Sequence, residues 1–284
     1  MSRMENHETQ PRTWFITGCS SGFGAALAQA ALNAGDRVCA TARDGSALAP
    51  FASHPRATLL PLDVTQPNAV RQAIHAAQEH LGSVDVIVNN AGAALFGALE
   101  DASESEVAAC MAVNFHGPLT VMQTAAPLLR AQQSGRVINI SAAAAIANYP
   151  GFAIYGAAKA ALEAASESFR LEMAPHGVHV TLVQPGPFRT DFIGRSLTRS
   201  ARTTPGYEAT AGKFGALLDK MHGRQPGDPD KAALAILRMV QEGRNPQRLV
   251  LGAYAQKKVR DTAAARVREL DEHAALGAGT EFSA

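Results

Sequence analysis

TWFITGCSSGFG, residues Thr13–Gly24, is the stretch of sequence that decides the fold. Its apolar first half, Thr13–Thr17, is typical of a short buried strand, and this strand stops at a glycine. A helical pattern follows over Gly22–Asn33 and ends at Gly35. Glycines at such a junction let the backbone approach a pyrophosphate, and the helix N-terminus offers it free N–H groups. A structural turn is the alternative, but the position after the first strand favours a dinucleotide site.

Strands and helices alternate through the rest of the chain, which predicts one α/β domain with a Rossmann-type, doubly wound parallel sheet. The further strands that we expect are Arg37–Ala42, Ala57–Leu62, Val84–Asn89, Arg136–Ser141, Val178–Gln184 and Arg248–Leu251. The further helices that we expect are Asn68–Leu81, Leu119–Gln132, Tyr155–Ala174, two that begin at Ser103 and Pro229, and a last amphipathic one through Val259, Ala263, Val267 and Leu270. We expect residues 1–12 and 273–284 to form tails, residues 13–272 the domain, and residues 187–227 a substrate lid.

The composition argues against several classes of partner. The 284 residues carry a formal net charge of +1, which gives no electrostatic footprint for nucleic acid or an anionic membrane. No apolar run is long enough to span a bilayer, and residues 1–12 lack the apolar centre of a signal peptide. Cys19, Cys39 and Cys110 show no CxxC spacing and fit a reducing cytosol. No histidines have HExxH spacing, so we expect no metal site, and we expect a cytoplasmic protein with a small-molecule substrate.

A tyrosine and a lysine mark the chemistry that the domain can perform. Tyr155 and Lys159 (YGAAK) lie four residues apart in an Ala-rich helical run, so they share one helix face. There the ammonium can lower the proton affinity of the phenol, whose ordinary pKa is about 10. Such a phenol exchanges a proton with a carbonyl or an alcohol. Together with a dinucleotide at the glycine loop, this pair predicts an oxidoreductase.

The end of the second expected strand, Thr41-Ala42-Arg43-Asp44, bears on the choice of dinucleotide. An NAD-selective site places a carboxylate against the ribose diol. Here Ala42 takes that place, and Arg43 can pair with a 2′-phosphate. A solvated Arg43 beside Asp44 is the alternative. We expect NADP(H) in preference to NAD(H).

The ordered motifs resemble the short-chain dehydrogenase/reductase family, in its TGxxxGxG and YxxxK subgroup. The resemblance covers about residues 12–255. Its motifs are TGCSSGFG at 17–24, LDV at 62–64, NNAG at 89–92, VNFHG around Asn114, YGAAK at 155–159 and PGPFRT at 185–190. The resemblance implies a seven-stranded doubly wound sheet and a carbonyl reductase or alcohol dehydrogenase. It also implies a homodimer or homotetramer paired through the tyrosine helix and its neighbour.

The resemblance also implies roles for individual residues. Tyr155 would be the general acid/base, Lys159 would bind the nicotinamide ribose and activate the tyrosine, and Asn114 would hold a relay water. Asp63 and Val64 would contact adenine, and Asn89, Ala91 and Gly92 would lie beside the ribose. The full cofactor set implied is Gly18, Ser20, Ser21, Gly22, Phe23, Gly24, Arg43, Asp63, Val64, Asn90, Ala91, Gly92, Tyr155, Lys159, Pro185, Gly186, Phe188 and Thr190.

One position departs from the family pattern. The family has a serine thirteen residues before the tyrosine, and this chain has Ala142 there. Ser141 precedes it, but adjacent strand residues point to opposite faces, so its hydroxyl should face away from the substrate. With Tyr155 alone holding the substrate oxygen, we expect a loss on the order of 10²–10³ in kcat.

Two explanations for Ala142 stay open: a disabled variant made to trap a substrate, which the intact Tyr155, Lys159 and Asn114 favour, or a natural member with reduced or different activity. Ala142 is also the one feature that favours a catalytically silent, redox-sensing dinucleotide-binding protein. A methyltransferase has no use for YxxxK. Steroid, polyketide, sugar and aromatic carbonyl substrates all remain open. Solvated surface positions are the preferred interpretation for four lid arginines, Arg189, Arg195, Arg199 and Arg202.

Overall fold

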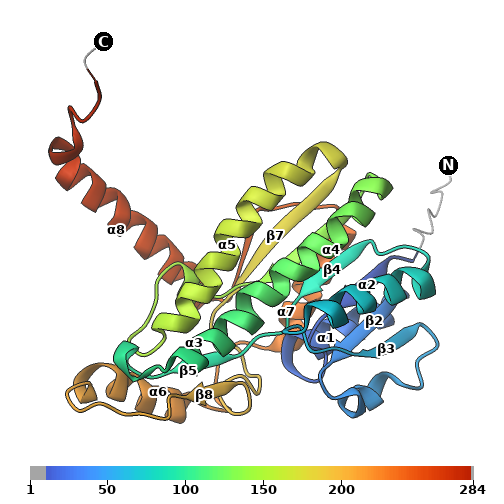
Figure 1. Ribbon diagram of the computed structural model, residues 1–284, viewed down its shortest axis with the longest axis horizontal. Coiled ribbons are helices and arrows are strands. Elements are labelled where there is room, and N and C mark those ends of the chain that lie inside the picture. The colour runs from blue at the N-terminus through green and yellow to red at the C-terminus, as the bar shows by residue number, and fades with distance from the viewer. Residues whose placement is uncertain (1–10, 283–284) are drawn as a thin grey trace, which may run out of the picture.

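A seven-stranded parallel sheet forms the centre of the molecule (Figure 1). The computed structural model describes residues 11–282, so most of the expected N-terminal tail lies outside the described part. The strands, in spatial order, are β3 (Ala57–Pro61), β2 (Arg37–Ala42), β1 (Thr13–Ile16), β4 (Val86–Asn89), β6 (Gly135–Ile140), β7 (Val178–Pro185) and β9 (Arg248–Leu251). The order runs outward from β1 in both directions, which confirms the doubly wound prediction. Parallel sheets of this kind bind ligands outside the carboxyl ends of the strands beside such a reversal.

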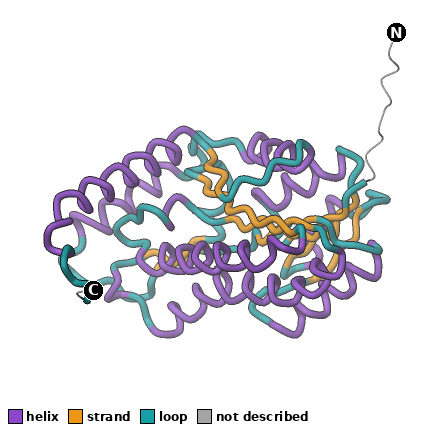
Figure 2. Tube along the Cα trace, turned by 90° about the horizontal axis from the view of Figure 1, so that it is seen from above, coloured by secondary structure: helices purple, strands orange, loops and turns teal. Residues whose placement is uncertain are grey.

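Helices cover both faces of the sheet, as the view from above shows (Figure 2). Trp14 and Ile16 point into one core with α1 and α7, and Phe15 points into the other core. This alternation buries an apolar run on both faces. The helices of the first core are α1 (Gly22–Asn33) and α7 (Pro229–Gln241), and those of the second are α2 (Pro67–Leu81), α4 (Gly117–Gln132) and α5 (Ala153–Met173).

The predicted helix starts follow capping chemistry. Pro67 occupies the first turn of α2, and Gly82 ends that helix with φ +80°. Ser103 and Glu106 form the expected capping box at the start of α3 (Glu104–Met111). A π-helical turn, Ala112–His116, joins α3 to α4, which the sequence pattern did not indicate.

The lid contains more structure than the sequence predicted. Its helix α6 (Lys213–Met221) contains the short helical pattern that the sequence shows near Phe214–Met221. A strand of three residues, β8 (Leu197–Arg199), pairs in parallel with β5 (Ala94–Phe96). Strands this short have no readable periodicity, and their pairing fixes the lid to the segment that follows β4.

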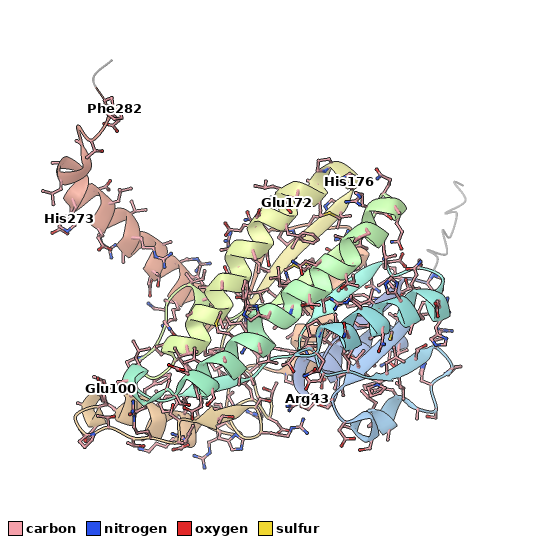
Figure 3. All side chains as sticks on the ribbon, in the orientation of Figure 1. Arg43, Glu100, Glu172, His176, His273 and Phe282 are labelled. Atoms are coloured by element: carbon pink, nitrogen blue, oxygen red, sulfur yellow. The ribbon has the colours of Figure 1, made fainter. Side chains whose placement is uncertain are left out.

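The last helix, α8 (Ala253–Gly277), projects from the body toward the end at Phe282 (Figures 1 and 3). It continues past residue 272 into the segment expected as a C-terminal tail. Ala255 is its buried residue. Among residues 11–282, no helix has both the length and the apolar character to cross a membrane.

Candidate active site

Helix α5 places Tyr155 and Lys159 at the carboxyl end of β6. Both side chains are buried, and the Lys159 ammonium donates a 2.8 Å hydrogen bond to the carbonyl of Ile140, the last residue of β6. The helix begins two residues before Tyr155, with Gly156 packed tightly against Asn148. The sequence therefore placed this pair correctly on one helix face.

Burial sets the protonation of the pair in the protein alone. Burial raises the pKa of Tyr155 above its ordinary value, and the nearby Cys110 thiol adds to this. Burial lowers the pKa of Lys159 to about 8. The direction of the Tyr155 pKa is opposite to the lowering expected from Lys159, because desolvation of the buried phenolate is the largest cause of the shift.

Asn114 lies in the π-helical turn, fully buried beside this pair. Its amide nitrogen donates to the carbonyls of Ala93 (2.6 Å) and Cys110 (2.9 Å), while its Oδ1 has no partner among the described residues. A Cβ on Gly92 would lie 3.1 Å from that Oδ1 and 3.5 Å from the Lys159 ammonium. Any residue larger than glycine at position 92 would therefore crowd this unpaired acceptor and this donor, which both lie beside it.

Ala142 follows β6 in extended backbone and joins a buried apolar cluster with Phe152 and Tyr155. Ser141 points the other way. Its hydroxyl donates a 2.6 Å hydrogen bond to Oε1 of Glu163, and its N–H continues the ladder to Val183. Ser141 therefore does not replace the missing serine, because strand alternation holds here.

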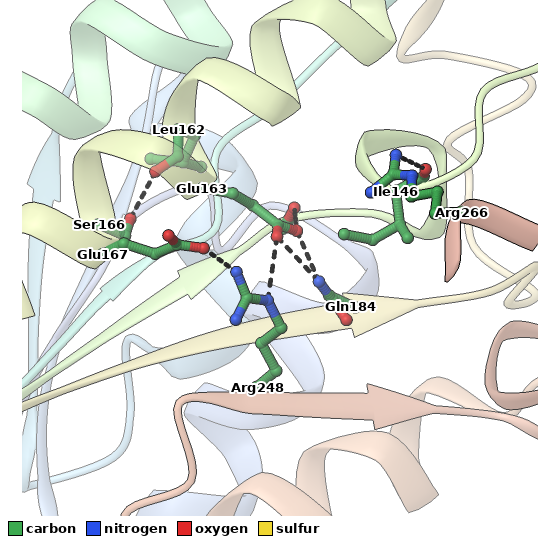
Figure 4. Close-up of polar contacts among 9 residues, drawn as sticks. Ile146, Leu162, Glu163, Ser166, Glu167, Gln184, Arg248 and Arg266 are labelled. Carbon is green, nitrogen blue, oxygen red and sulfur yellow. Dashed lines mark hydrogen bonds and ion pairs between the residues drawn. The ribbon is translucent and has the colours of Figure 1, made fainter. Parts of the chain in front are cut away.

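Glu163 is a site residue that the sequence reading missed (Figure 4). Both carboxylate oxygens accept from Nε2 of Gln184, at 2.8 and 2.9 Å, and Arg248 of β9 approaches at 3.4 Å. Arg248 also pairs with Glu167 one turn along α5. This network ties α5 to β6, β7 and β9. Its sequence signal was a carboxylate four residues after Lys159, and so on the same face of the helix.

The glycine loop curves as the dinucleotide prediction requires. Gly18 has φ +73°, and a Cβ there would lie 2.9 Å from Ala91 Cα. Asn90 donates to the carbonyls of Thr17 and Gly18 at 2.9 Å each, so it holds the loop. Asn89 is buried and bonds Asn139 inside the sheet at 2.8 Å, and its expected place beside the ribose stays a prediction.

Arg43 and Asp44 lie exposed where β2 ends (Figure 3). Asp44 accepts from the N–H and hydroxyl of Ser46 at 2.9 and 2.7 Å, which lowers the pKa of its carboxyl. Asp44 is therefore engaged in a local cap, and Arg43 has no ion-pair partner among the described residues. Two residues after β3, Asp63 similarly accepts hydrogen bonds from the N–H and the hydroxyl of Thr65.

The lid begins against the glycine loop. Phe188 packs edge-on against Phe23 at 5.0 Å, and Thr190 lies next to Gly22, whose Cβ would meet it at 3.3 Å. From further along the lid, Arg195 donates to Ser21 Oγ at 2.5 Å and lies 3.4 Å from Ser20 Oγ. Arg195 is exposed, yet it makes a specific contact with the loop rather than only with solvent.

Two other lid arginines also have partners. Arg189 donates to the carbonyl of Gln225, and Arg199 pairs with Asp219 at 2.6 Å. Both arginines are exposed, as the solvated interpretation expects, and they make these contacts because short strands and turns that periodicity does not reveal fold the lid back on the body.

The residues fit a nicotinamide dinucleotide by their chemistry. The N-terminus of α1 carries two serines, Ser20 and Ser21, just before it, and Gly24 lets this turn pack closely, since a Cβ there would meet Gly18 O at 2.3 Å. The unpaired Asn114 oxygen and the Lys159 ammonium both lie beside Gly92. The predicted site residues lie at or after the carboxyl ends of β1, β2, β3, β4, β6 and β7.

Comparisons with known proteins agree with this geometry. The sequence profile described as short chain dehydrogenase matches residues 12–200. Oxidoreductase BOA17 of Botryotinia fuckeliana is 37% identical over 244 residues, covering 85% of this chain and 89% of that protein. A short-chain dehydrogenase structure from Streptomyces avermitilis has a TM-score of 0.89 at 36% identity, covering 96% of this chain and 100% of that one. One from Burkholderia cenocepacia in complex with NADP has a TM-score of 0.73 at 26% identity, covering 92% and 97%.

Proposed function

Because the chain belongs to the short-chain dehydrogenase family and is an oxidoreductase, we propose that it interconverts a ketone or aldehyde and an alcohol with Tyr155 as general acid/base. The observation that carries this proposal is the buried Tyr155 on α5, one turn from Lys159 and facing the carboxyl end of β6. When bound, the nicotinamide supplies or accepts the hydride at the substrate carbon.

The chain's own residues handle the proton. In reduction, the Tyr155 hydroxyl donates its proton to the carbonyl oxygen, and in oxidation the phenolate takes the proton of the alcohol. Lys159 stabilises the phenolate formed in reduction. The Asn114 oxygen orients a water beside the Lys159 ammonium, and this water passes the replacement proton inward.

The proposed cofactor is NADP(H). The family neighbour from B. cenocepacia binds NADP, and in this chain Arg43 is free to meet a 2′-phosphate while Asp44 is held by Ser46. The residue that ends β2, Ala42, offers no carboxylate to a ribose diol. Replacing Arg43 by Leu should weaken NADP(H) binding and leave NAD(H) binding unchanged, as measured by titration of each dinucleotide.

Ala142 makes the proposed reaction slow. No hydroxyl from β6 helps Tyr155 hold the substrate oxygen, because Ser141 is bonded to Glu163 behind the strand. Ala142 also supports a second candidate function, a dinucleotide-binding protein that performs no turnover. Incubating the chain with NADPH and a panel of ketones, and following the absorbance of NADPH, separates the two. Steady consumption with alcohol formation supports the enzyme, and its absence with every ketone supports the silent protein.

We propose in addition that α5 pairs two copies of the chain. Small side chains line the exposed face of α5, at Ala157, Ala160, Ala164 and Ser168. Such a face lets two helices approach closely. Light scattering of the Ala164→Arg variant tests this proposal: a loss of mass to the monomer supports it, and an unchanged mass contradicts it.

A further inference from the structure

Aromatic rings surround the reacting phenol. Phe152 lies 5.4 Å from the Tyr155 ring, and Phe192 of the lid lies 5.5 Å from it. Phe152 in turn meets Phe96 edge-on at 5.6 Å and Phe214 at 5.7 Å. These rings come from β5, α5, the lid and α6, so they gather here only through the tertiary fold.

A fifth ring fixes the outer end of this group. Tyr149 stacks on Phe214 with 4.9 Å between centroids and 10° between planes. Its hydroxyl donates to Tyr254 of α8 at 3.0 Å, and the Lys258 ammonium lies 3.6 Å from its ring centroid. Phe214 is thereby held from behind, in one orientation, while it faces Phe152 and Phe96.

The wall beside the phenol lacks the polar group that the family places there. Ala142 contributes a methyl group to the same buried cluster. Two buried polar side chains nearby are already engaged, since Ser141 bonds Glu163 and Lys159 bonds the Ile140 carbonyl. The unpaired Asn114 oxygen lies beside Gly92, outside the aromatic cluster. A sugar packed against this apolar surface would exchange the hydrogen bonds that its hydroxyl groups make with water for none, and each buried, unpaired hydroxyl would weaken its binding.

The aromatic rings around Tyr155 are accessible to solvent on the side that faces the lid. Phe192, Phe214 and Tyr149 are half-buried, whereas Phe96, Phe152 and Tyr155 are buried. Of the two rings that contact Tyr155, Phe192 is therefore the one that a ligand can reach from the lid side.

We propose that the substrate is a planar aromatic ketone, or the matching alcohol, whose ring packs between Phe192 and Phe152 while its oxygen meets Tyr155. This inference rests on the proposed function. Aromatic rings in offset or edge-to-face contact gain more than the burial of their area, by roughly 2- to 12-fold in binding per pair. A saturated ring of the same size gains the burial alone.

Two ketones with the same bicyclic skeleton test the proposal. 1-Tetralone carries an aromatic ring, and 1-decalone is fully saturated. We expect kcat/KM with NADPH to be roughly tenfold higher for 1-tetralone. The Phe192→Leu variant should reduce this ratio about 3- to 10-fold, mainly through 1-tetralone. The same substitution at the exposed Phe282 is the matched control and should leave the ratio unchanged.

A binding measurement separates failure of this inference from failure of the proposed function. Trp14 is fully buried in the first core, so its fluorescence gives a constant background for a Phe192→Trp reporter. Titrating this variant should give a lower Kd for 1-tetralone than for 1-decalone, whether or not either ketone is reduced. Equal Kd values, no binding of either ketone, or equal kcat/KM values in the parent chain would overturn the aromatic assignment. Absence of turnover with tighter 1-tetralone binding would overturn the proposed function instead.

Discussion

Helices α5 and α8 are both long and rich in alanine, yet one carries the candidate chemistry and the other projects from the body. Helix α5 buries eight of its 21 residues, Tyr155 and Lys159 among them, whereas α8 buries one of 25. The cause is their place in the chain. Helix α5 connects β6 to the neighbouring β7 and must lie across the sheet, whereas α8 follows the edge strand β9 and, within residues 11–282, leads to no further strand. Composition alone does not separate the two.

The base of α8 still contacts the candidate site. Tyr254 and Lys258 hold Tyr149, and Arg266 donates a 2.8 Å hydrogen bond to the carbonyl of Ile146, as Figure 4 also shows. Beyond Arg266, the apolar side chains Val267, Leu270 and Leu276 are largely exposed. We therefore expect substitutions at buried positions of α5 to have large effects and substitutions on the exposed part of α8 to have small ones.

The largest change expected short of removing the phenol is at Ala142, beside α5. Ala142→Ser returns a donor to the substrate oxygen and should raise kcat about 10²- to 10³-fold. The affinity for NADP(H) should barely move, since Ala142 lies in the apolar cluster and not in the glycine loop. Steady-state kinetics of both forms with one ketone give the answer, and equal kcat values would contradict the role of this position.

The buried carboxylate of α5 should matter for stability far more than one on α8. Glu163→Ala leaves Ser141 and Gln184 without their acceptor and leaves Arg248 paired with Glu167 alone. We expect a loss of about 2–4 kcal/mol in the free energy of unfolding, below the full range for buried pairs because Arg248 is a third exposed.

Glu272→Ala on the exposed part of α8 is the matched control. It should change the free energy of unfolding by less than about 0.5 kcal/mol. Urea titrations of the two variants make the comparison, and equal losses in the free energy of unfolding would show that the hydrogen bonds of Glu163 do not stabilise the fold.

Lys159 predicts an activity that falls with pH while its own contribution to stability rises. Its pKa is lowered to about 8, so the ammonium is lost above that pH and the rate of reduction should decline. In the unfolded chain this lysine keeps its proton up to about pH 10.4. Between about pH 8 and 10.4 the unfolded state therefore binds more protons than the folded state, so the contribution of Lys159 to the free energy of unfolding increases as pH rises. Rate and urea midpoint measured from pH 7 to 10 test this. A flat rate across pH 8 would contradict the role of the ammonium.

The smallest effect is expected at the far end of α8. Removing residues 268–284 takes away Leu270 and Leu276, which are 69% and 81% exposed, and leaves Arg266 with its Ile146 contact. We expect the thermal midpoint and kcat to stay within error of the full chain. A marked loss of either would mean that this part of α8 has a partner and that its contrast with α5 is only apparent.

The sheet and the reacting pair were predictable because they depend on local order in the chain. The glycine loop, the β-branched runs and YGAAK are each recognised by residue spacing within a single helix, strand or turn. The opposite orientations of Ser141 and Ala142 followed from strand alternation in the same way.

What the sequence did not predict depends on contacts between distant segments. Pairing of β5 with β8, the partners of Glu163 and the gathering of Phe96, Phe152, Phe192 and Phe214 have no periodic signal. The pKa of Tyr155 was expected to fall and instead rises, because the burial of the phenol is set by the lid and β5 rather than by Lys159.

The most direct test of the account is the rate of ketone reduction by Tyr155→Phe, compared with its parent in the Ala142→Ser background. The phenylalanine ring preserves the packing against Phe152 and Phe192 and removes only the proton donor. We predict a loss of about 10²- to 10⁴-fold in kcat with NADP(H) affinity retained. An undiminished kcat would contradict the claim that Tyr155 passes the proton.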